Sequence, residues 1–517
     1  ENIVIYTVSR YLGKDVLRNM ANPFLPLDTY IADGEPHVFG DRVYLFGSHD
    51  QAGGDTYCML SYEFWSAPVD NLESWSCKGT SYRADQDPQY GEKLKYMYAP
   101  DVVQGNDGRF YLYYCMSGEK GVGGYGQQIS VAVCDTPDGN YEYYGCVRNP
   151  DGSPMLKFVT FDPALINDNG TIRLYYGTWY PFHERGKLLD PIFHKVESNM
   201  FGKSVEEIQS DPDGVMGANH VELADDMLTI QSQPIHVMPS RVKGTSFEKH
   251  PFFEGSSIRK LGSTYYFIYS SIKGHELCYA TSAYPDRDFT YGGTIVSNGD
   301  VGYEGRKDRD RLNATGTNHG SIECIRGKWY VFYHRNTHKS GYSRQACAEP
   351  VEILPDGRIP QVEITSQGFC GPLESNRTYP ASICCNLYSG KMPHIGNGVS
   401  SAKIPHITCE DGQQIVVATN RARIVYKYFH LAAGEYVLIL RYKTSGRAKI
   451  TVLGEHGEIP TLIKPSRTWM EMEIPCRFQS GIQPLILRYH GSKELSIQSI
   501  CLQRSSSHET EANHADS

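Results

Sequence analysis

Short hydrophobic runs separated by tight turns recur along the first two thirds of the chain. Residues 30–50, YIADGEPHVFGDRVYLFGSHD, place an acidic residue before a strand-like run, which a turn joins to a second run rich in Tyr and Val. Similar segments occupy residues 99–115, 161–177, 253–271 and 319–335. Apolar runs of this length, bounded by Gly, Asn or Asp, indicate antiparallel hairpins.

The five hairpins share a spacing as well as a composition. They align on the first residue after the turn: Arg42, Arg109, Thr171, Ser263 and Lys328. A polar residue lies nine positions upstream in four of the repeats and eight positions upstream in the second. The residues in this place are Asp33, Asp101, Asp162, Glu254 and His319.

A fixed repeat of hairpins predicts an all-β fold with a five-bladed β-propeller of four-stranded blades. Because the innermost strand of each blade lines the central channel, equivalent positions near the strand starts converge at one mouth of that channel. The repeat thus gathers carboxylates from distant parts of the sequence. The alternative is five unrelated hairpins in a mixed β protein.

The pattern changes after the fifth hairpin. Residues 343–368 read as closing strands, and from about residue 383 to 503 short strands alternate with turns at the spacing of a jelly-roll-like β-sandwich. We therefore expect an N-terminal extension (1–21), a propeller (22–372), a sandwich (373–505) and a polar, disordered tail (506–517). No amphipathic helix of convincing length is expected.

Composition narrows the class of protein. The net charge of −9 is spread along the chain, which argues against nucleic-acid binding, and no apolar run reaches the length of a membrane span. The 14 cysteines form no CxxC pair and lie mostly in strand-like runs, which favours buried free thiols and a cytoplasmic location. The alternative is a secreted or periplasmic protein whose leader has been removed, because the sequence starts at Glu1.

The gathered carboxylates suit glycoside hydrolysis, which needs one protonated and one ionised carboxyl group on either side of a bond. Glu254 follows Pro and two Phe, and apolar neighbours raise the pKa of a carboxyl group. A nearby carboxylate such as Asp101 would raise it further, while Asp33 could stay ionised and activate water. Each Asp could instead only cap a turn. His319 could be a hydrogen-bonded channel residue or a ligand to a metal or water.

Taken together, these motifs resemble glycoside hydrolase family 43 over residues 22–368. The segments on which this resemblance rests are ADGEP at Asp33, YAPD at Asp101, FEGS at Glu254, FDPALINDNG at Asp162, HGS at His319 and YSRQACAEP at Arg344. The resemblance implies an inverting hydrolase with Asp33 as base, Glu254 as acid and Asp101 as orienter and pKa tuner. It also implies an active-site Arg344 and an axial His319 near an ion. Gly34 departs from the usual Pro, and Glu35-Pro36 is an alternative alignment for the base.

The C-terminal segment is similar, through weaker motifs, to a family 6 carbohydrate-binding module. Ser382 and Gln498 stand where such modules have acidic calcium ligands. Trp469 could stack on sugar, but a core or interface position is favoured. The segment could also be a structural domain without sugar affinity.

The expected function is exo-acting, inverting removal of terminal α-L-arabinofuranosyl units from an oligo- or polysaccharide. The alternatives are β-D-xylosidase, β-D-galactofuranosidase and a catalytically inactive carbohydrate-binding propeller; a retaining fructosidase-type propeller is disfavoured because its NDPNG and RDP segments are absent. His49, Asp50, Asp162 and Arg344 are the expected substrate-binding residues. No cofactor is expected for the chemistry, although calcium or another ion on the axis would be structural. The oligomeric state stays open.

Overall fold

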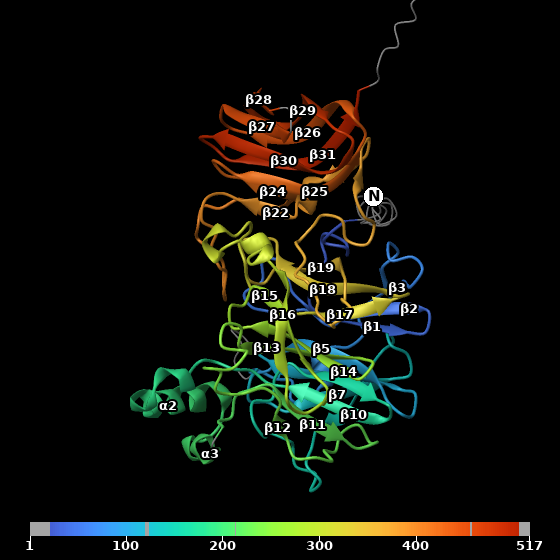
Figure 1. The fold of residues 1–517 in the computed structure, drawn as a ribbon, viewed down its shortest axis with the longest axis vertical. Coiled ribbons are helices and arrows are strands. Elements are labelled where there is room, and N and C mark those ends of the chain that lie inside the picture. Colours follow the sequence, from blue (N-terminus) through green and yellow to red (C-terminus); the bar gives the residue numbers. More distant parts are fainter. Residues whose placement is uncertain (1–20, 119–123, 212, 455–456, 506–517) are drawn as a thin grey trace, which may run out of the picture. The chain divides into compact units, whose positions relative to one another are not determined.

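The computed structural model describes residues 21–118, 124–211, 213–454 and 457–505. The chain divides into two compact units (Figure 1). The larger comprises residues 1–364, 368–370 and 391–402, and the smaller comprises 365–367, 371–390 and 403–517. Most of the predicted N-terminal extension (1–20) and the predicted tail (506–517) lie outside the described residues.

The larger unit consists of antiparallel sheets whose strands follow one another in sequence, as in propeller blades. Blade 1 holds β1 (Ile31–Phe39), β2 (Arg42–His49), β3 (Trp65–Pro68) and β4 (Ser76–Cys77). Blade 2 holds β5 (Tyr96–Gln104), β6 (Phe110–Ser117), β7 (Ile129–Cys134) and β8 (Glu142–Cys146). Blade 3 holds β9 (Ala164–Asp168), β10 (Thr171–Tyr176), β11 (Asn219–Leu223) and β12 (Ile235–His236). Blade 4 holds β13 (Phe252–Leu261), β14 (Thr264–Ser271), β15 (Glu276–Ser282) and β16 (Thr290–Ser297).

Blade 5 differs from the expected four strands. It holds β17 (Ser321–Ile325), β18 (Lys328–Asn336) and β19 (Arg344–Val351), and these three make up the whole sheet among the described residues. The start of the chain runs beside its last strand, where the Phe24 backbone N–H donates to the Ala346 carbonyl at 3.2 Å. The Asn22 side chain also donates to the Ala348 carbonyl at 2.9 Å. Contacts between residues 22–24 and blade 5 therefore help to close the ring.

The core of the propeller lies between neighbouring blades. Five clusters of buried apolar residues each join two adjacent blades, so that the last cluster links blade 5 back to blade 1. Tyr supplies many of the largest fully buried side chains, including Tyr113, Tyr175 and Tyr269. Most of the abundant Tyr thus pack the blades together. Because burial is distributed around the ring, its centre is free to hold polar groups.

The conserved spacing of the repeat corresponds to a shared structural feature. In blades 1, 2 and 4 the pairing register of the inner strand shifts next to the acidic residue: between Ala32 and Glu35, between Tyr98 and Asp101, and on both sides of Glu254. Such β-bulges redirect a side chain relative to the sheet. Asp33, Asp101 and Glu254 lie on the inner strands, while Asp162 and His319 lie two residues before theirs.

The expectation of no substantial helix is wrong. Helix α2 (Asp190–Phe201) and α3 (Val205–Ser210) are inserted between β10 and β11 and project to the side of the blades in Figure 1, while Phe201 and Ile208 pack in the apolar cluster between blades 3 and 4. Glu197 and Phe201 are buried on α2, and the Ser204 side chain caps α3 by accepting from the Glu207 backbone N–H. Ile192 and Val196 of α2 are exposed, so the helix lacks the continuous buried apolar stripe that would mark it in the sequence.

Residues 391–402 belong to the larger unit, although the sequence places them in the sandwich. The Ile395 backbone N–H donates to the Thr315 carbonyl at 2.6 Å, and Ser340 forms a β-bridge with Val399. These backbone contacts draw the segment back to the propeller.

The smaller unit is the predicted β-sandwich. One sheet contains β20 (Leu373–Glu374), β22 (Asn386–Tyr388), β25 (Arg423–Leu431), β27 (Ala448–Gly454), β28 (Gly457–Ile463) and β30 (Gly481–Gly491). The other contains β21 (Thr378–Pro380), β23 (His406–Glu410), β24 (Gln413–Ala418), β26 (Gly434–Thr444), β29 (Ser466–Phe478) and β31 (Leu495–Arg504).

The three side chains of this unit that the sequence relates to sugar or calcium binding are Trp469, Ser382 and Gln498. Trp469 is partly exposed, with the Lys443 ammonium 4.9 Å from its ring centroid. Ser382 is buried, and Gln498 accepts from Arg441 Nε at 2.5 Å. Neither of the two groups of metal-ligating side chains found in the described part of the chain lies in the sandwich. Sugar binding by this unit stays a prediction.

All fourteen cysteines are free thiols, as the sequence predicts, but only seven of them are buried, and the cytoplasmic location itself stays a prediction. None of the helices in the described ranges is long and apolar enough to cross a membrane.

Candidate active site

Asp33 is a buried residue at the bulge of β1. Its backbone is in the left-handed region, with φ of 53°. Non-Gly residues rarely adopt this conformation, although Asp does so more readily than most. Gly47 lies opposite this bulge on β2. A side chain does not fit there, because a Cβ on Gly47 would lie 2.5 Å from the Ala32 carbonyl oxygen. The Asp33 backbone N–H donates to His334 Nδ1 at 3.0 Å. The base position is thus fixed through its own backbone.

Arg344, the first residue of β19, binds the Asp33 carboxylate. Its Nη1 donates to Asp33 Oδ1 at 2.7 Å and to Oδ2 at 3.0 Å. Burial is the largest single influence and raises the pKa of Asp33, but Arg344, His334, His319 and Ser48 together outweigh it, with Arg344 the largest of these four, and the pKa falls to about 2. Asp33 is therefore a carboxylate at neutral pH.

Asp50 supports the same arginine from the other side. Its oxygens accept from Arg344 Nε at 2.8 Å and Nη2 at 2.9 Å, and Oδ1 also accepts from the Cys58 backbone N–H at 3.0 Å. Asp50 is fully buried. Its oxygens are engaged by protein donors, so the structure places it as the orienter of Arg344 and not, as the sequence suggested, as a ligand to sugar hydroxyls.

Glu254 lies at a second bulge, opposite Ser270 on β14 and followed by Gly255. Burial and then the Asp33 charge raise the pKa of Glu254 to about 8. Gly255 has φ of 72°, and a Cβ on it would press on the His319 ring at 3.0 Å. A glycine is needed here because both the backbone angle and the close histidine exclude a side chain.

Asp162 is the carboxyl group that neighbours Glu254. Its Oδ2 accepts from the Gly255 backbone N–H at 3.0 Å, and its φ is 45°. Burial, then Glu254 and Asp33, raise the pKa of Asp162 well above its usual range. Two carboxyl groups this close cannot both ionise freely, so the pair keeps a proton near neutral pH. The Gly255 N–H favours the ionised form of Asp162 and so opposes the rise of its pKa.

The geometry corrects the assignment of Asp101 as the tuner of Glu254. Asp101 is fully buried, and its Oδ1 accepts from His37 Nε2 and from its neighbour Val102 N–H, both at 2.7 Å. Its Oδ2 accepts from Leu165 N–H of the next blade at 2.6 Å. Among the described residues Asp101 has no hydrogen bond or ion pair with Asp33 or Glu254. It ties blade 2 to blade 3.

Glu35, the alternative base, lies in a different setting. It is buried and accepts from Arg259 Nη2 at 3.0 Å. Burial raises the pKa of Glu35 to about 7, although Arg259 opposes the rise. It also groups with His37 and Asp101 as side chains that could hold a metal. Because Arg259 already supplies a positive charge there and backbone N–H groups occupy Asp101, these residues make a poor calcium cage.

His319 is positioned between the two acidic groups. Its Nδ1 lies 3.6 Å from Asp33 Oδ1 and 3.9 Å from Asp162 Oδ2. Burial lowers its pKa, so the imidazole is neutral. Its buried Nε2 has no hydrogen-bond partner among the described residues. One lone nitrogen fits contact with a water or with the hydration shell of an ion, but calcium itself prefers six to eight oxygen ligands.

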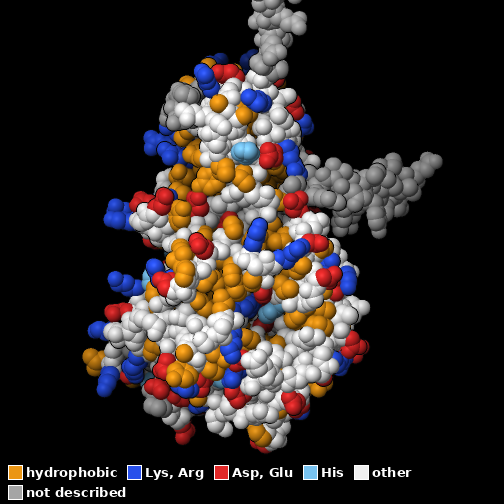
Figure 2. Space-filling model, turned by 45° about the vertical axis from the view of Figure 1, so that its right-hand side comes forward, with side chains coloured by type: hydrophobic (Ala, Val, Ile, Leu, Met, Phe, Trp, Pro, Cys, Tyr) orange, Lys and Arg blue, Asp and Glu red, His pale blue; other side chains and the backbone are white. Residues whose placement is uncertain are grey.

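Aromatic residues line the surroundings of Glu254. The Tyr125 and Tyr180 hydroxyls hydrogen-bond at 3.0 Å, and Tyr180 packs edge-on against Phe253 at 5.3 Å between centroids. The Arg344 guanidinium lies 4.7 Å from the Tyr57 ring centroid. Figure 2 shows a hollow in the face of the propeller unit where histidine, basic and acidic side chains lie among hydrophobic ones.

The predicted residues are thus partly brought together. Asp33, Asp162, Glu254, His319 and Arg344 form one constellation. His49 contacts the Ser61 carbonyl through Nδ1 at 3.0 Å, and among the described residues it has no hydrogen bond or ion pair with these carboxylates. His334 was missed. Its pKa falls to about 3 through burial, so it is neutral; Nδ1 accepts from Asp33 N–H while Nε2 donates to the Thr317 carbonyl at 3.0 Å. Its position in the middle of an ordinary strand sequence gave no signal.

One family model and several known proteins match most of this chain. The model for glycosyl hydrolases family 43 matches residues 21–359. A protein from Thermoclostridium stercorarium named xylosidase/arabinosidase is 38% identical over 507 residues, covering 93% of this chain and 98% of that protein. An arabinoxylan arabinofuranohydrolase from Paenibacillus polymyxa is 25% identical, covering 90% of this chain and 72% of its own length.

A solved structure agrees with the fold. The Xanthomonas citri GH43_1 enzyme in complex with xylose has a TM-score of 0.50 and 25% sequence identity. The match covers 67% of this chain and 94% of that protein.

Proposed function

This chain belongs to glycosyl hydrolase family 43, and from that premise we propose that it is an exo-acting, inverting hydrolase that removes single terminal pentosyl units from oligosaccharides. The preferred unit in this proposal is α-L-arabinofuranosyl, and β-D-xylosyl is accepted in the same site. One observation carries the mechanism: a carboxylate held ionised by Arg344 shares one site with a carboxyl group that keeps its proton.

In this mechanism Asp33 is the general base. Its carboxylate accepts a proton from a water molecule, and the oxygen of that water attacks the anomeric carbon. Glu254 is the general acid, and it donates its proton to the glycosidic oxygen as the bond to the leaving sugar breaks. Attack and departure on opposite faces invert the anomeric centre. Inverting enzymes hold the two carboxyl groups about 6.5–9.5 Å apart, which leaves room for the water.

The other side chains position these two groups. Asp162, whose pKa is raised by burial and by neighbouring Glu254, takes in this proposal the tuning role that was expected of Asp101. Arg344 keeps Asp33 ionised, and its donors are engaged by Asp33, Asp50 and Cys58, so its part in substrate binding is indirect. Neutral His319 and His334 stabilise the Asp33 backbone and carboxylate without competing for the proton. No step requires a cofactor, and an ion held near His319 through water would act on the electrostatics of the site alone.

The substrate assignment rests on relatives. The T. stercorarium relative is named for both xylose and arabinose activity, and the X. citri structure contains xylose. These names support a terminal pentose. The Tyr-rich surroundings of Glu254 suit the apolar faces of sugar rings. A cytoplasmic site of action, on imported oligosaccharides, agrees with the free thiols.

A panel of nitrophenyl glycosides tests this proposal. The α-L-arabinofuranoside should have the highest kcat/KM, the β-D-xylopyranoside should be turned over, and the β-D-galactofuranoside should be much slower. Fast turnover of the galactofuranoside alone would refute the pentose assignment. The absence of turnover of all three, with an Asp33→Asn variant as the blank, would favour the binding-only alternative.

A further inference from the structure

A second cavity, of about 990 Å³, lies in the propeller unit at the outer side of blade 4. Ligand sites in proteins typically have volumes of about 300–1,000 Å³. Its lining comes from the β14–β15 turn (Lys273, His275), from β16 (Tyr291, Thr294) and from the loop that carries Arg306 and Lys307. None of these residues belongs to the constellation around Asp33 and Glu254.

The cavity begins at the edge of the blade that carries Glu254. Glu254 pairs with Ser270, which pairs with Leu277, which pairs with Val296 on β16. Strands in a sheet are about 4.8 Å apart, so this row spans about 14 Å from the acid to β16. A chain of a few sugar units bound at Glu254 can therefore extend along this edge to the cavity.

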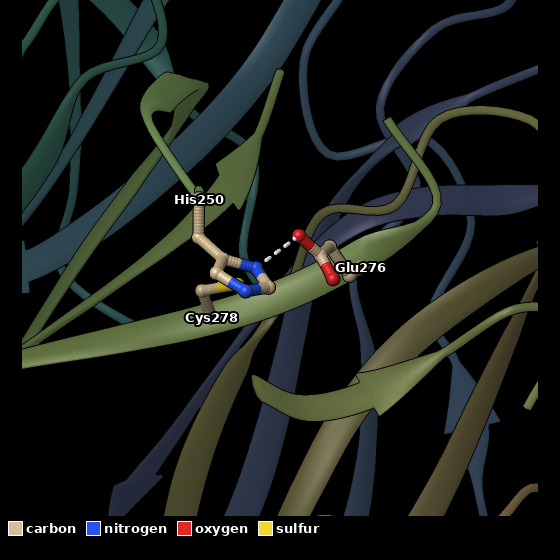
Figure 3. Close-up of side chains that lie close together, drawn as sticks. All are labelled: His250, Glu276 and Cys278. Carbon is tan, nitrogen blue, oxygen red and sulfur yellow. Dashed lines mark hydrogen bonds and ion pairs between the residues drawn. The ribbon is translucent and has the colours of Figure 1, made fainter. Parts of the chain in front are cut away.

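Three side chains at this cavity resemble a metal site but do not form one. Figure 3 shows His250, Glu276 and Cys278 close together, with His250 Nδ1 2.6 Å from Glu276 Oε1. The Lys273 ammonium lies 3.3 Å from the same nitrogen and 3.5 Å from the same oxygen, where a cation would have to bind. Burial raises the pKa of the Cys278 thiol strongly, which disfavours the thiolate that binds metals. The cluster is an ion-pair network that fixes Glu276.

The positive charges of the cavity exceed its negative ones. Glu276 is satisfied by His250, Ser271 and Lys273, while Asp308 binds Arg311. Arg306 and Lys307 form no ion pair with another described residue. The Arg306 Nε is shielded from solvent and lacks a hydrogen-bond partner in the described part of the chain. A shielded guanidinium nitrogen without an acceptor is costly, and an anionic ligand would supply that acceptor.

An aromatic ring lines the same cavity as these cations. Tyr291 is partly exposed and stacks on His250 at 4.7 Å between centroids, with the planes 8° apart. Tyr rings bind the apolar faces of sugars, and guanidinium groups bind carboxylates with two parallel hydrogen bonds. A neutral sugar would leave the two cations unpaired, and a bare phosphate would not use the ring. The combination fits a sugar that carries a carboxylate.

We propose that this cavity binds the carboxylate and ring of a uronic-acid unit carried as a branch by the saccharide whose end is cleaved at Asp33 and Glu254. The inference rests on the proposed function for the position of the chain, but the binding can be measured without turnover. The site would select acidic oligosaccharides over neutral ones of the same length.

Calorimetric titration of the full-length Glu254→Gln variant tests the proposal. The probes are a xylo-oligosaccharide with one glucuronic-acid branch, the same oligosaccharide without the branch, and inorganic phosphate. The branched probe should bind about tenfold tighter than the unbranched one, because its carboxylate gains charge-assisted hydrogen bonds. Raising the ionic strength should reduce the difference.

Arg306→Ala combined with Lys307→Ala should abolish the preference. Arg309→Ala is the matched control, because Arg309 lies on the same loop, pairs with Asp310 at 3.5 Å and does not line the cavity. In the otherwise wild-type chain, both the double variant and the control should keep kcat/KM on nitrophenyl arabinofuranoside, which tests the catalytic proposal separately.

Equal binding of both oligosaccharides, or a preference that survives the double substitution, overturns the proposal. Phosphate that binds as tightly as the branched probe and displaces it would show an anion site without sugar selectivity, and would also overturn it.

Discussion

Arg344 donates to Asp33 at 2.7 and 3.0 Å through Nη1 while its Nε and Nη2 bind Asp50. One guanidinium thus donates both to buried Asp50, which holds it in place, and to Asp33, which accepts a proton in the proposed mechanism. Asp33 lies in blade 1 and Arg344 in blade 5, so closure of the propeller ring creates the pair. The state of the base depends on this contact, since burial alone would raise its pKa.

Arg344→Ala should therefore move the acidic limb of the pH–rate profile upward. In the wild type, kcat/KM falls only as pH drops toward the Asp33 pKa of about 2, where the base becomes protonated. Without the guanidinium that pKa rises, and kcat/KM at neutral pH should drop by about 100-fold, within the usual range for a misplaced general base. Arg344→Lys, which keeps a charge but not the two-sided geometry, should lie between. An acidic limb that does not move would contradict this role.

Glu254→Gln tests the acid. Substrates with poor leaving groups need protonation of the glycosidic oxygen, so their turnover should fall by about 10²–10⁴-fold, while an activated dinitrophenyl glycoside should lose much less. The wild-type profile should also have an alkaline limb near the Glu254 pKa of about 8, because activity needs the protonated form and is lost as pH rises through that value. This limb should vanish in the variant. Equal losses on both substrates would exclude Glu254 as the acid.

Asp162→Asn should shift that alkaline limb to lower pH. Removal of a nearby negative charge makes ionisation of Glu254 easier, and a shift of about one pH unit is expected. Asp101→Asn is the informative comparison, because Asp101 accepts from Leu165 N–H and does not contact Glu254. It should leave the limb in place and lower the free energy of unfolding by about 1–3 kcal/mol, since a buried donor loses its acceptor. The reverse pattern would restore Asp101 as the tuner.

The sequence predicts the propeller because five hairpins repeat with one spacing, and it predicts Asp33 and Glu254 because both occupy the repeated place. Asp101 occupies that place too, but its side chain accepts a hydrogen bond from the next blade. The repeat gives positions along strands, and the direction of a side chain at a bulge depends on the partner strand. His334 and Tyr57 carry no repeat signal, since their proximity to the site arises only when blade 5 meets blade 1. Helix α2 escaped notice because the strand period dominates its surroundings.

Metal removal should have little effect on the chemistry. His319 Nε2 has no hydrogen-bond partner among the described residues, and the carboxylates near this histidine, Asp33 and Asp162, are already bound to Arg344 or to a backbone N–H group. Because calcium needs several oxygen ligands, chelation should change kcat by less than about threefold. His319→Gln is the comparison, and it should lower kcat more than chelation does, by disturbing Asp33 and Asp162 directly. A large loss on chelation that added calcium restores would show that an ion is part of the working site.

The stereochemistry of the first product follows from the arrangement of Asp33 and Glu254. If Asp33 activates water on the face opposite the leaving group, hydrolysis of an α-L-arabinofuranoside releases the β-anomer first, and mutarotation produces the α-anomer later. Proton NMR spectra recorded during the first minutes of turnover distinguish the two orders of appearance. Methanol added as a second nucleophile gives a further test of the mechanism. An inverting site forms no glycosyl-enzyme intermediate, so methanol should yield no methyl glycoside of retained configuration. Initial release of the α-anomer would mean that Asp33 attacks the sugar itself, and the assignment of Asp33 as a base would be wrong even if Glu254 keeps its role.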